Sequence, residues 1–382
     1  MGTILDYLGW RGDLTLKQSP FNEVDNLLLA ELSFLELTDI VPDVGQGRSV
    51  KLHRAVEQYF ARREGEEISM GVLVPDQILI MAKEMAASPR FRDMPLSGFR
   101  SILDPDREIQ FAALTIDTGD GSLYLSFRGT DDTLVGWKED FNMTFLSEVP
   151  SQQLAAEYLR ETARHSRGKQ LRLGGHSKGG NLAVYAAVHC GAAVQKRLEM
   201  VYNNDGPGFK ESLLERPEYR AVRERIVTIV PQSSVVGMLL EHDDNYHVVH
   251  SSQQGLNQHD GFSWQVQGTS FVRMEERSTE GRVNEKAIRG FFANLDDDQR
   301  RQFVDAMFEV LSSTNAQTLT ELDSDRLRSL TAMVKTYKEL NKESRQVLAE
   351  ALRVILKAST DNLVEGLEEK SEALRRLWEN KK

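Results

Sequence analysis

The chain has 382 residues, of which 40% are hydrophobic and 27% are charged, a composition typical of a globular protein with one large core or two smaller ones. Its 47 Lys and Arg residues stand against 58 Asp and Glu residues, and the resulting formal charge of −11 argues against nucleic acid as a partner and gives no support to adhesion on anionic membranes. Cys190 is the only cysteine, which excludes an intrachain disulfide and a metal site built from several cysteines.

No segment has the pattern of a signal peptide or a membrane span. Residues 1–8 lack a basic start followed by a long apolar run. The most apolar stretch, residues 27–41, is interrupted by Glu31, Glu36 and Asp39, and it is too short and too charged to cross a bilayer. We therefore expect a cytoplasmic protein with no integral membrane segment.

Residues 1–105 are predicted to be a mainly helical lead-in. Asn22 can cap a helix with a broad apolar face that includes Leu28 and Leu35. Further helices are expected around residues 52–60 and from Asp76 onward, after a proline.

Residues 106–270 are predicted to form the sheet core. Two strand-like runs, 109–116 and 122–127, are joined by the turn-forming residues 117–121, a pattern typical of a β-hairpin. A helix is expected at 151–166, and short strands at 170–174, 198–202, 225–230 and 246–250. Because these strands alternate with helices, the sequence predicts an α/β fold with a mostly parallel sheet to which the hairpin adds antiparallel strands.

Residues 271–382 are predicted to form a C-terminal helical region. Helices rich in Glu, Lys, Arg and Leu are expected at 284–294, 297–313, 317–340 and 342–380. Their polar faces mix acids with bases, which favours packing on the sheet domain, on a protein partner or on a second copy over binding to a membrane.

A glycine-flanked serine lies between a predicted strand and a predicted helix. The residues are Gly175-His176-Ser177-Lys178-Gly179, with an apolar strand before them and an apolar helix after them. A strand, a sharp turn and a helix form the elbow that presents the nucleophile of G-x-S-x-G hydrolases, and the helix directs free N–H groups and its positive end at the reacting oxygen. We therefore predict Ser177 as a nucleophile. The alternative is a serine that only caps the helix.

A serine nucleophile needs a base, which in elbow enzymes follows later in the chain. His242, His247, His250 and His259 follow the strand after the elbow. His247 and His250 fall within a predicted strand, whereas His259 lies in a polar, turn-prone loop that can reach over the sheet edge. We predict His259 as the base; the alternative is an exposed loop histidine.

An acid that orients the base is predicted at Asp205. This residue follows the strand at 198–202, and ligand sites in open α/β sheets gather at the carboxyl ends of strands. The next strand ends in residues 231–234, which contain no carboxylate. Asp243 and Asp244, in the loop before the last strand, are the alternatives. Asp205 could also serve only as an Asp-Gly turn former.

Backbone N–H groups must stabilise the negative charge that develops on the carbonyl oxygen during acyl transfer. One is expected from Lys178, directly after the nucleophile, and the other from Thr130, in the turn after the strand at 122–127. The alternative to an oxyanion role is that the turn containing Thr130 is an ordinary turn at the end of a strand. Arg128 is predicted to be a structural partner of a carboxylate.

These motifs resemble the fungal-type, or class 3, lipases of the α/β-hydrolase superfamily. The resemblance rests on Ser126-Phe127-Arg128-Gly129-Thr130, Trp137 with Asp140, the run from Gly175 to Ala183, and Pro207-Gly208. It covers about residues 105–265 and looks closest to a bacterial branch with lysine after the serine and a Gln-His-Asp segment. It implies an α/β-hydrolase fold, with Thr130 in the oxyanion hole, Ser177 as the nucleophile and His259 as the base.

The chain departs from that family at two positions. Lys178 replaces the usual leucine, and residues 232–234 stand where these lipases carry their acid. Either Asp205 takes the acid's role or the site is weakened. Residues from 271 onward match nothing in the lipase core.

The resulting expectation is a serine hydrolase that cleaves acyl or lipid esters through an acyl-enzyme and needs no metal or organic cofactor. The rivals are a non-catalytic interaction protein that keeps the fold, and a thioesterase or peptidase. An apolar lid or acyl-binding wall, or plain core, is expected from Leu134, Val135, Trp137, Phe141, Met143 and Phe145.

The Lys178 side chain is expected to reach solvent, a protein carboxylate or an anionic head group of the substrate, because burying an unpaired ammonium is costly. Since its N–H would serve the oxyanion whatever its side chain, Lys178→Leu is expected to preserve the catalytic machinery.

Overall fold

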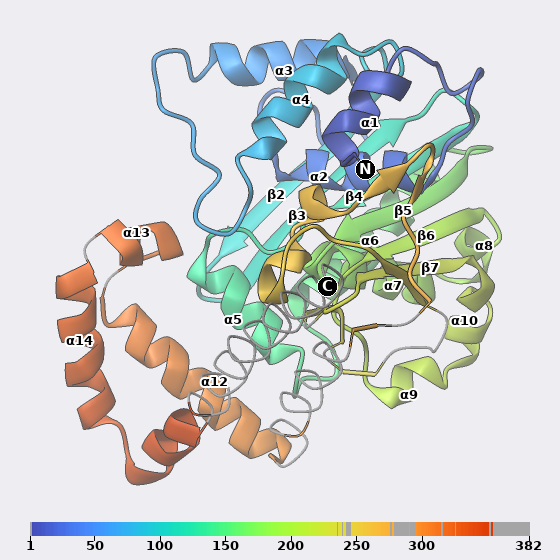
Figure 1. Cartoon of the computed structure of the whole chain (residues 1–382). Helices are drawn as coiled ribbons and strands as arrows, with labels where there is room; N and C mark the ends of the chain where they lie inside the picture. Colours follow the sequence, from blue (N-terminus) through green and yellow to red (C-terminus); the bar gives the residue numbers. More distant parts are fainter. Residues whose placement is uncertain are drawn as a thin grey trace, which may run out of the picture.

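The central element of the computed structural model is a sheet of eight strands in sequence order, β1 to β8 (Figure 1). The structure describes residues 2–234, 236–238, 240, 241, 246–275, 277, 278, 290, 295–314, 316–324, 326–350 and 353. The strands are β1 Val50–Lys51, β2 Pro95–Asp104, β3 Ile109–Asp117, β4 Ser122–Phe127, β5 Gln170–His176, β6 Leu198–Asn204, β7 Ile226–Pro231 and β8 Tyr246–Val249. β1 to β4 pair antiparallel and β4 to β8 pair parallel, which confirms the predicted α/β fold.

One long strand, β2, lies within the region predicted to be mainly helical. It pairs with β3 from Leu96 opposite Ile116 to Asp104 opposite Ile109. Its register shifts after Ser97, and Gly98 has a φ of 65°. Such a bulge interrupts the period-two alternation by which a strand is identified, and for this reason the sequence pattern missed β2.

Helices cover both faces of the sheet (Figure 1). One face carries α1 Ile4–Arg11, α2 Glu23–Glu31, α3 Leu52–Ala61 and α4 Gln77–Ala87, and the other carries α6 Pro150–His165 and α7 Lys178–His189. β3 serves both cores, because Leu114 and Ile116 pack with the first group while Phe111 and Ala113 pack with the second. The alternation along β3 is what a central strand buried on both faces requires.

The register brings the carboxyl ends of the middle strands together. Phe127 at the end of β4 lies opposite Gly175 of β5, and His176 at the end of β5 lies opposite Asn204 of β6. The residues that follow these strands therefore meet at one edge of the sheet, where ligand sites of open α/β sheets lie.

Three C-terminal helices form a group of which the first packs against α5 Leu134–Asn142 (Figure 1). They are α12 Asp297–Ser312, α13 Leu319–Ser324 and α14 Arg326–Glu339, which fall within the predicted helices at 297–313 and 317–340; residues 342–350 are also helical. Leu134 and Phe145 form one buried cluster with Phe303 and Val304. The predicted helix at 284–294, apart from residue 290, and most of that at 342–380 lie outside the described residues.

The remaining elements are short connections between these layers. They are η1 Leu32–Phe34, α8 Ala192–Gln195, α9 Glu211–Leu214, α10 Pro217–Arg220, η2 Arg223–Arg225, η3 Val236–Met238, η4 Gly255–His259, η5 Gly261–Ser263 and the two-stranded sheet β9 Val266–Gln267 with β10 Ser270–Phe271. In the described part of the chain, no helix has the length and apolar character that a membrane crossing needs.

Candidate active site

Ser177 occupies the sharp turn between β5 and α7. Its φ of 57° and ψ of −133° lie in a region that residues other than glycine rarely adopt. Two glycines let the backbones approach each other here, because a Cβ on Gly179 would lie 2.0 Å from the Phe127 carbonyl oxygen and one on Gly175 would lie 2.3 Å from Gly179. The Ser177 N–H donates to the Asn204 carbonyl at 2.9 Å, which ties the turn to β6. The predicted strand–turn–helix geometry is therefore present.

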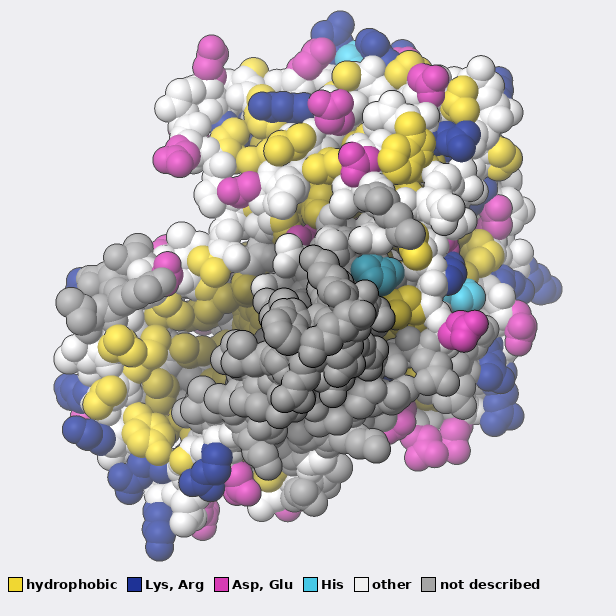
Figure 2. Space-filling view, viewed as in Figure 1, with side chains coloured by type: hydrophobic (Ala, Val, Ile, Leu, Met, Phe, Trp, Pro, Cys, Tyr) yellow, Lys and Arg dark blue, Asp and Glu magenta, His cyan; other side chains and the backbone are white. Residues whose placement is uncertain are grey.

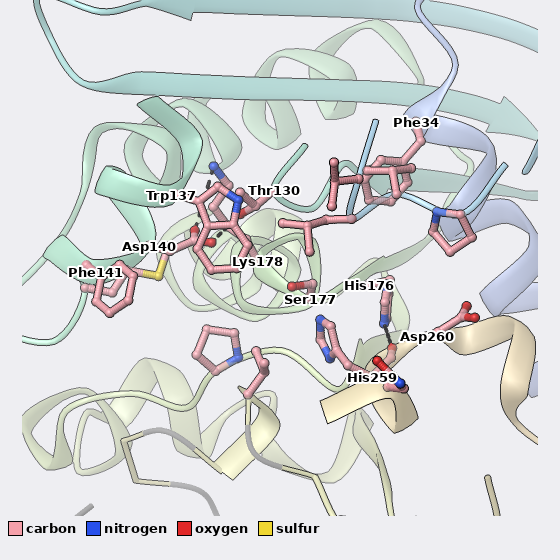
Figure 3. A pocket seen from close by; sticks show the side chains of 18 of the residues that line it. Phe34, Thr130, Trp137, Asp140, Phe141, His176, Ser177, Lys178, His259 and Asp260 are labelled. Carbon is pink, nitrogen blue, oxygen red and sulfur yellow. Dashed lines mark hydrogen bonds and ion pairs between the residues drawn. The ribbon is translucent and has the colours of Figure 1, made fainter. Parts of the chain in front are cut away.

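Ser177 borders a cavity of about 590 Å³ at the carboxyl edge of the sheet (Figure 3). Its lining is largely apolar and comes from the segment before α4, from α5 and from the loops after β6 and β7. The apolar lining residues are Phe34, Val72, Leu73, Val74, Pro75, Trp137, Phe141, Met143, Pro207, Val236 and Leu240. Thr130, Lys178 and His259 also line it, so four of the five predicted site residues reach one cavity.

His259, at the end of η4, is held by Asp205. Its Nδ1 lies 2.7 Å from Asp205 Oδ2, and the Asp205 side chain is fully buried whereas the imidazole is 26% exposed. Because a carboxylate accepts and cannot donate, Nδ1 carries the proton and Nε2 is free to accept one. The predicted pairing of His259 with Asp205 is present in the structure; Asp243 and Asp244, the alternative acids, lie outside the described residues.

The segment after β7, which contains no carboxylate, supports Asp205 through a serine. Ser234 donates its hydroxyl to Asp205 Oδ1, and the Asp205 N–H donates to the Ile229 carbonyl at 2.8 Å. Asp205 itself has a φ of 50°, so the backbone leaves the extended conformation directly after β6. The carboxylate thus has a partner on each oxygen.

Figure 3 shows the side chains of Ser177 and His259 next to each other at the cavity. Within the described residues no hydrogen bond joins Ser177 Oγ to His259 Nε2. In ligand-free active sites such bonds are often long, and they shorten when substrate binds.

The turn after β4 approaches the elbow from the other side. The Thr130 hydroxyl donates to Asp140 Oδ2. No described residue accepts a hydrogen bond from the N–H of Thr130 or from that of Lys178, the first residue of α7. Burial raises the pKa of Asp140 to about 6, against the lowering effect of the nearby Lys178 ammonium. Arg128 points away, donating to the carbonyls of Ser33 and Leu35 and pairing with Glu36, so its predicted structural role is confirmed.

The Lys178 side chain is fully buried beneath the site. Its Nζ donates to the Gln110 carbonyl at 2.8 Å and to Gln110 Oε1, and it lies 3.2 Å from Glu139 Oε2. Glu139 also accepts from the N–H and the hydroxyl of Ser151. All three ammonium protons therefore have acceptors inside the protein.

This arrangement corrects two expectations. An anionic head group cannot be the partner of Lys178, because its ammonium is paired with Glu139 under the cavity and does not extend into it. Nor is a leucine expected to leave the machinery intact, since the lysine connects the elbow to Gln110, whose amide donates to Gly129 O and Asp131 in the turn after β4. Of the options weighed from the sequence, contact with a protein carboxylate is the correct one.

Lys178→Met is expected to lower the free energy of unfolding by about 3–5 kcal/mol, the usual cost of leaving one member of a buried ion pair alone. Denaturant unfolding measures it, with Lys17→Met, at an exposed position, as the control. The double variant Lys178→Met/Glu139→Gln should recover part of the loss, because it removes both charges. A single variant as stable as the wild type would contradict the role of this pair.

The residues expected to form an apolar wall divide between two environments. Trp137, Phe141 and Met143 line the cavity, and Leu134 and Phe145 belong to the buried cluster shared with the C-terminal helices, against which Trp137 and Phe141 also pack. α5 is therefore a wall with the cavity on one side and α12 on the other.

Sequence reasoning missed two residues behind His259. The His176 ring lies tilted beside that of His259, with centroids 4.7 Å apart, and Glu31 at the end of α2 is buried next to it. The only signal in the sequence was that Glu31 interrupts the apolar stretch 27–41, together with Glu36 and Asp39.

The sheet order, the crossover helices and the nucleophile-type elbow define this molecule as a protein of α/β-hydrolase fold. A family model described as Mbeg1-like matches residues 85–309, more than half of the chain. The chain belongs to the Mbeg1-like family. No curated protein matches it in sequence.

Solved structures with a partial likeness to this chain include fungal proteins. The Rhizomucor miehei lipase–propeptide complex is 14% identical, with a TM-score of 0.32, over 44% of this chain and 66% of that one, so the chain spans just under two thirds of that lipase. Lip2 lipase from Yarrowia lipolytica is 12% identical, with a TM-score of 0.33, over 64% and 94% of the two chains. A mutant MDLA from Penicillium cyclopium is 14% identical, with a TM-score of 0.36, over 65% and 84%.

Proposed function

We propose that this chain is a serine hydrolase that cleaves carboxylic esters of acyl chains through an acyl-enzyme. The observation that carries the proposal is the His259–Asp205 contact of 2.7 Å beside Ser177, at the edge of an apolar cavity. A nucleophile on a strained turn, a base held in one tautomer and an apolar pocket for the acyl chain are the parts that cleavage of an acyl ester needs.

Ser177 Oγ attacks the ester carbonyl while His259 Nε2 accepts its proton. His259 then returns the proton to the departing alcohol. In the second half it takes a proton from the water that attacks the acyl-enzyme and returns it to Ser177 Oγ as the bond to the acyl group breaks and the carboxylic acid leaves. Asp205 keeps the proton on Nδ1 and stabilises the imidazolium that forms in each half.

The oxyanion is held by the N–H groups of Thr130 and Lys178, both free of other acceptors among the described residues. Asp140 accepts a hydrogen bond from the Thr130 hydroxyl and so fixes its position. Lys178 Nζ holds the start of α7 in place through its contacts with Gln110 and Glu139. None of these steps needs a metal or an organic cofactor.

The rival assignment, a non-catalytic interaction protein, drew its support from the lack of a carboxylate after Val230. The contact between Asp205 and His259 supports the hydrolase instead. A thioesterase or a peptidase would use the same catalytic groups. The comparison of esters, thioesters and peptides described next distinguishes an esterase from these two enzymes.

Turnover of p-nitrophenyl esters is expected to rise with acyl-chain length from acetate upward, by about fourfold in kcat/KM for each added CH₂ that is buried, or about 0.8 kcal/mol. The apolar lining from Val72 to Pro75 and from Trp137 to Met143 is the reason. Acyl thioesters and acyl peptides of the same chain lengths serve as the comparison. No ester turnover, or turnover independent of chain length, would contradict the proposed substrate class.

Three predictions from the sequence remain proposals. They are the division into a hydrolase domain at 1–270 and a helical region at 271–382, the cytoplasmic location, and the likeness to a bacterial branch of lipase-like proteins.

Association through the C-terminal helices is also a proposal. Figure 2 shows apolar side chains at the surface over these helices, and on α14 Leu330 and Val334 are 57% and 50% exposed. Such a face fits a protein partner or a second copy. A molar mass in solution equal to that of one chain would contradict self-association.

A further inference from the structure

Glu31 and His176 form a buried contact that the proposed mechanism does not use. Glu31 is the last residue of α2 and its side chain is 2% exposed, while His176 ends β5 and its side chain is 10% exposed. Glu31 Oε1 lies 3.2 Å from His176 Nδ1. Both residues line the cavity next to His259.

The other nitrogen of His176 fixes which protons the ring carries. Nε2 lies 2.8 Å from the backbone carbonyl oxygen of His259. Because a carbonyl oxygen only accepts, Nε2 must carry a hydrogen. In the neutral ring, Nδ1 is then an acceptor, and the nearest acidic oxygen to it is Glu31 Oε1 at 3.2 Å.

Glu31 completes this pattern as a carboxylic acid. With His176 neutral, a Glu31 carboxylate would be a buried charge without a donor, because Nδ1 then carries no proton and Oε1 has no other hydrogen-bond partner among the described residues. As an acid it can donate its own proton to Nδ1. Burial and the nearby Asp260 raise the pKa of Glu31 well above its usual range, and burial lowers the pKa of His176, so both groups favour their neutral forms.

We propose that Glu31 and His176 are a neutral positioning pair for the base of the proposed hydrolysis: the Glu31 carboxyl group donates to His176 Nδ1, and His176 Nε2–H donates to the His259 carbonyl. This inference rests on the proposed function. In this proposal Glu31 and His176 hold the loop that carries His259 in place, and they do not contact the substrate.

The neutral form matters because of where His176 lies. Its ring centroid is 4.7 Å from that of His259, with an angle of 31° between the planes. The alternative, a Glu31 carboxylate with a His176 imidazolium, contains the same number of protons but puts a cation against the ring that becomes positive when it deprotonates Ser177. A neutral His176 ring still donates to the His259 carbonyl, and it does not repel the positive charge that develops on the His259 ring.

Two substitutions of Glu31 separate these forms. Glutamine keeps an N–H donor for Nδ1 and has no proton to transfer, so Glu31→Gln is expected to keep kcat/KM close to wild type. Leucine removes the donor, so Glu31→Leu is expected to lower kcat/KM by about 10²-fold, the scale of a displaced catalytic group. Equal loss in both variants would overturn the proposal.

The pH profile supplies a readout that a purely structural role would not move. The groups facing the pair are Asp260 and His259 from the η4 loop and Tyr124 from β4. With a neutral pair, Glu31→Gln leaves the acid limb of kcat/KM where the wild type has it. With an ion pair, the variant would remove a cation beside His259 and move that limb to higher pH.

Nitrogen-15 NMR of the histidine rings tests the pair without any substrate. Two well-separated ring signals for His176, with the proton on Nε2, are expected near neutral pH. Two similar signals, as in an imidazolium, would overturn the proposal. This spectrum does not depend on turnover. If the chain hydrolyses no ester, the proposed function is refuted, whereas the spectrum still shows whether Glu31 and His176 are neutral.

Discussion

Ser177→Ala is expected to lower kcat for ester hydrolysis by on the order of 10⁶-fold, the loss observed when the serine of a comparable triad is removed. Without Oγ no acyl-enzyme forms, and only binding and the oxyanion N–H groups remain to accelerate attack by water. Thermal stability should change little, because one hydroxyl without a hydrogen bond to any described residue is lost from the turn.

The measurement is turnover of a p-nitrophenyl ester together with thermal unfolding of the same samples. Ser212→Ala, at an exposed position of α9, is the matched control and should retain wild-type turnover. If Ser177→Ala hydrolyses the ester at the rate of this control, the hydrolysis does not proceed through Ser177.

Asp205→Asn is expected to cut kcat on the order of 10⁴-fold, as the corresponding change does in the Ser-His-Asp triad. The carboxylate accepts the proton of His259 Nδ1 at 2.7 Å and is fully buried, so no water can substitute for it. An asparagine amide in that place can donate to Nδ1 and so favours the tautomer with the proton on Nε2, in which His259 cannot act as a base.

Asp243→Asn and Asp244→Asn provide the comparison, because these residues were the alternative acids, and far smaller losses are expected from them. A larger loss at either of them than at Asp205 would move the acid to that later loop. Equal small losses at all three would indicate a Ser177–His259 dyad.

The parts of the site that neighbouring residues determine could be predicted from the sequence. Gly175, Ser177 and Gly179 lie within five residues, and the strand before and the helix after them have clear apolar patterns. Asp205 followed from topology, because the carboxyl ends of adjacent parallel strands meet at one edge. The antiparallel hairpin was predictable for the same reason as the elbow, since its turn residues are consecutive.

The parts that depend on distant residues could not be predicted. Lys178 finds its acceptors in Gln110 and Glu139, 68 and 39 residues away, and nothing near it in the sequence indicates that it would be buried and paired. Ser234 lies in the segment after β7, which contains no carboxylate, and its contact with Asp205 arises only from the pairing of β6 with β7. β2 was missed because the bulge near Gly98 disrupts its alternation.

The central claim, that Ser177 is an activated nucleophile held by His259 and Asp205, is tested most directly by labelling with a fluorophosphonate. Such a probe phosphonylates serines that a base activates. The account predicts that the wild-type chain is labelled at the peptide containing Ser177, identified by mass spectrometry, that Asp205→Asn is labelled far more slowly, and that Ser177→Ala is not labelled. A wild-type chain that resists the probe, or equal labelling of Ser177→Ala, would contradict it.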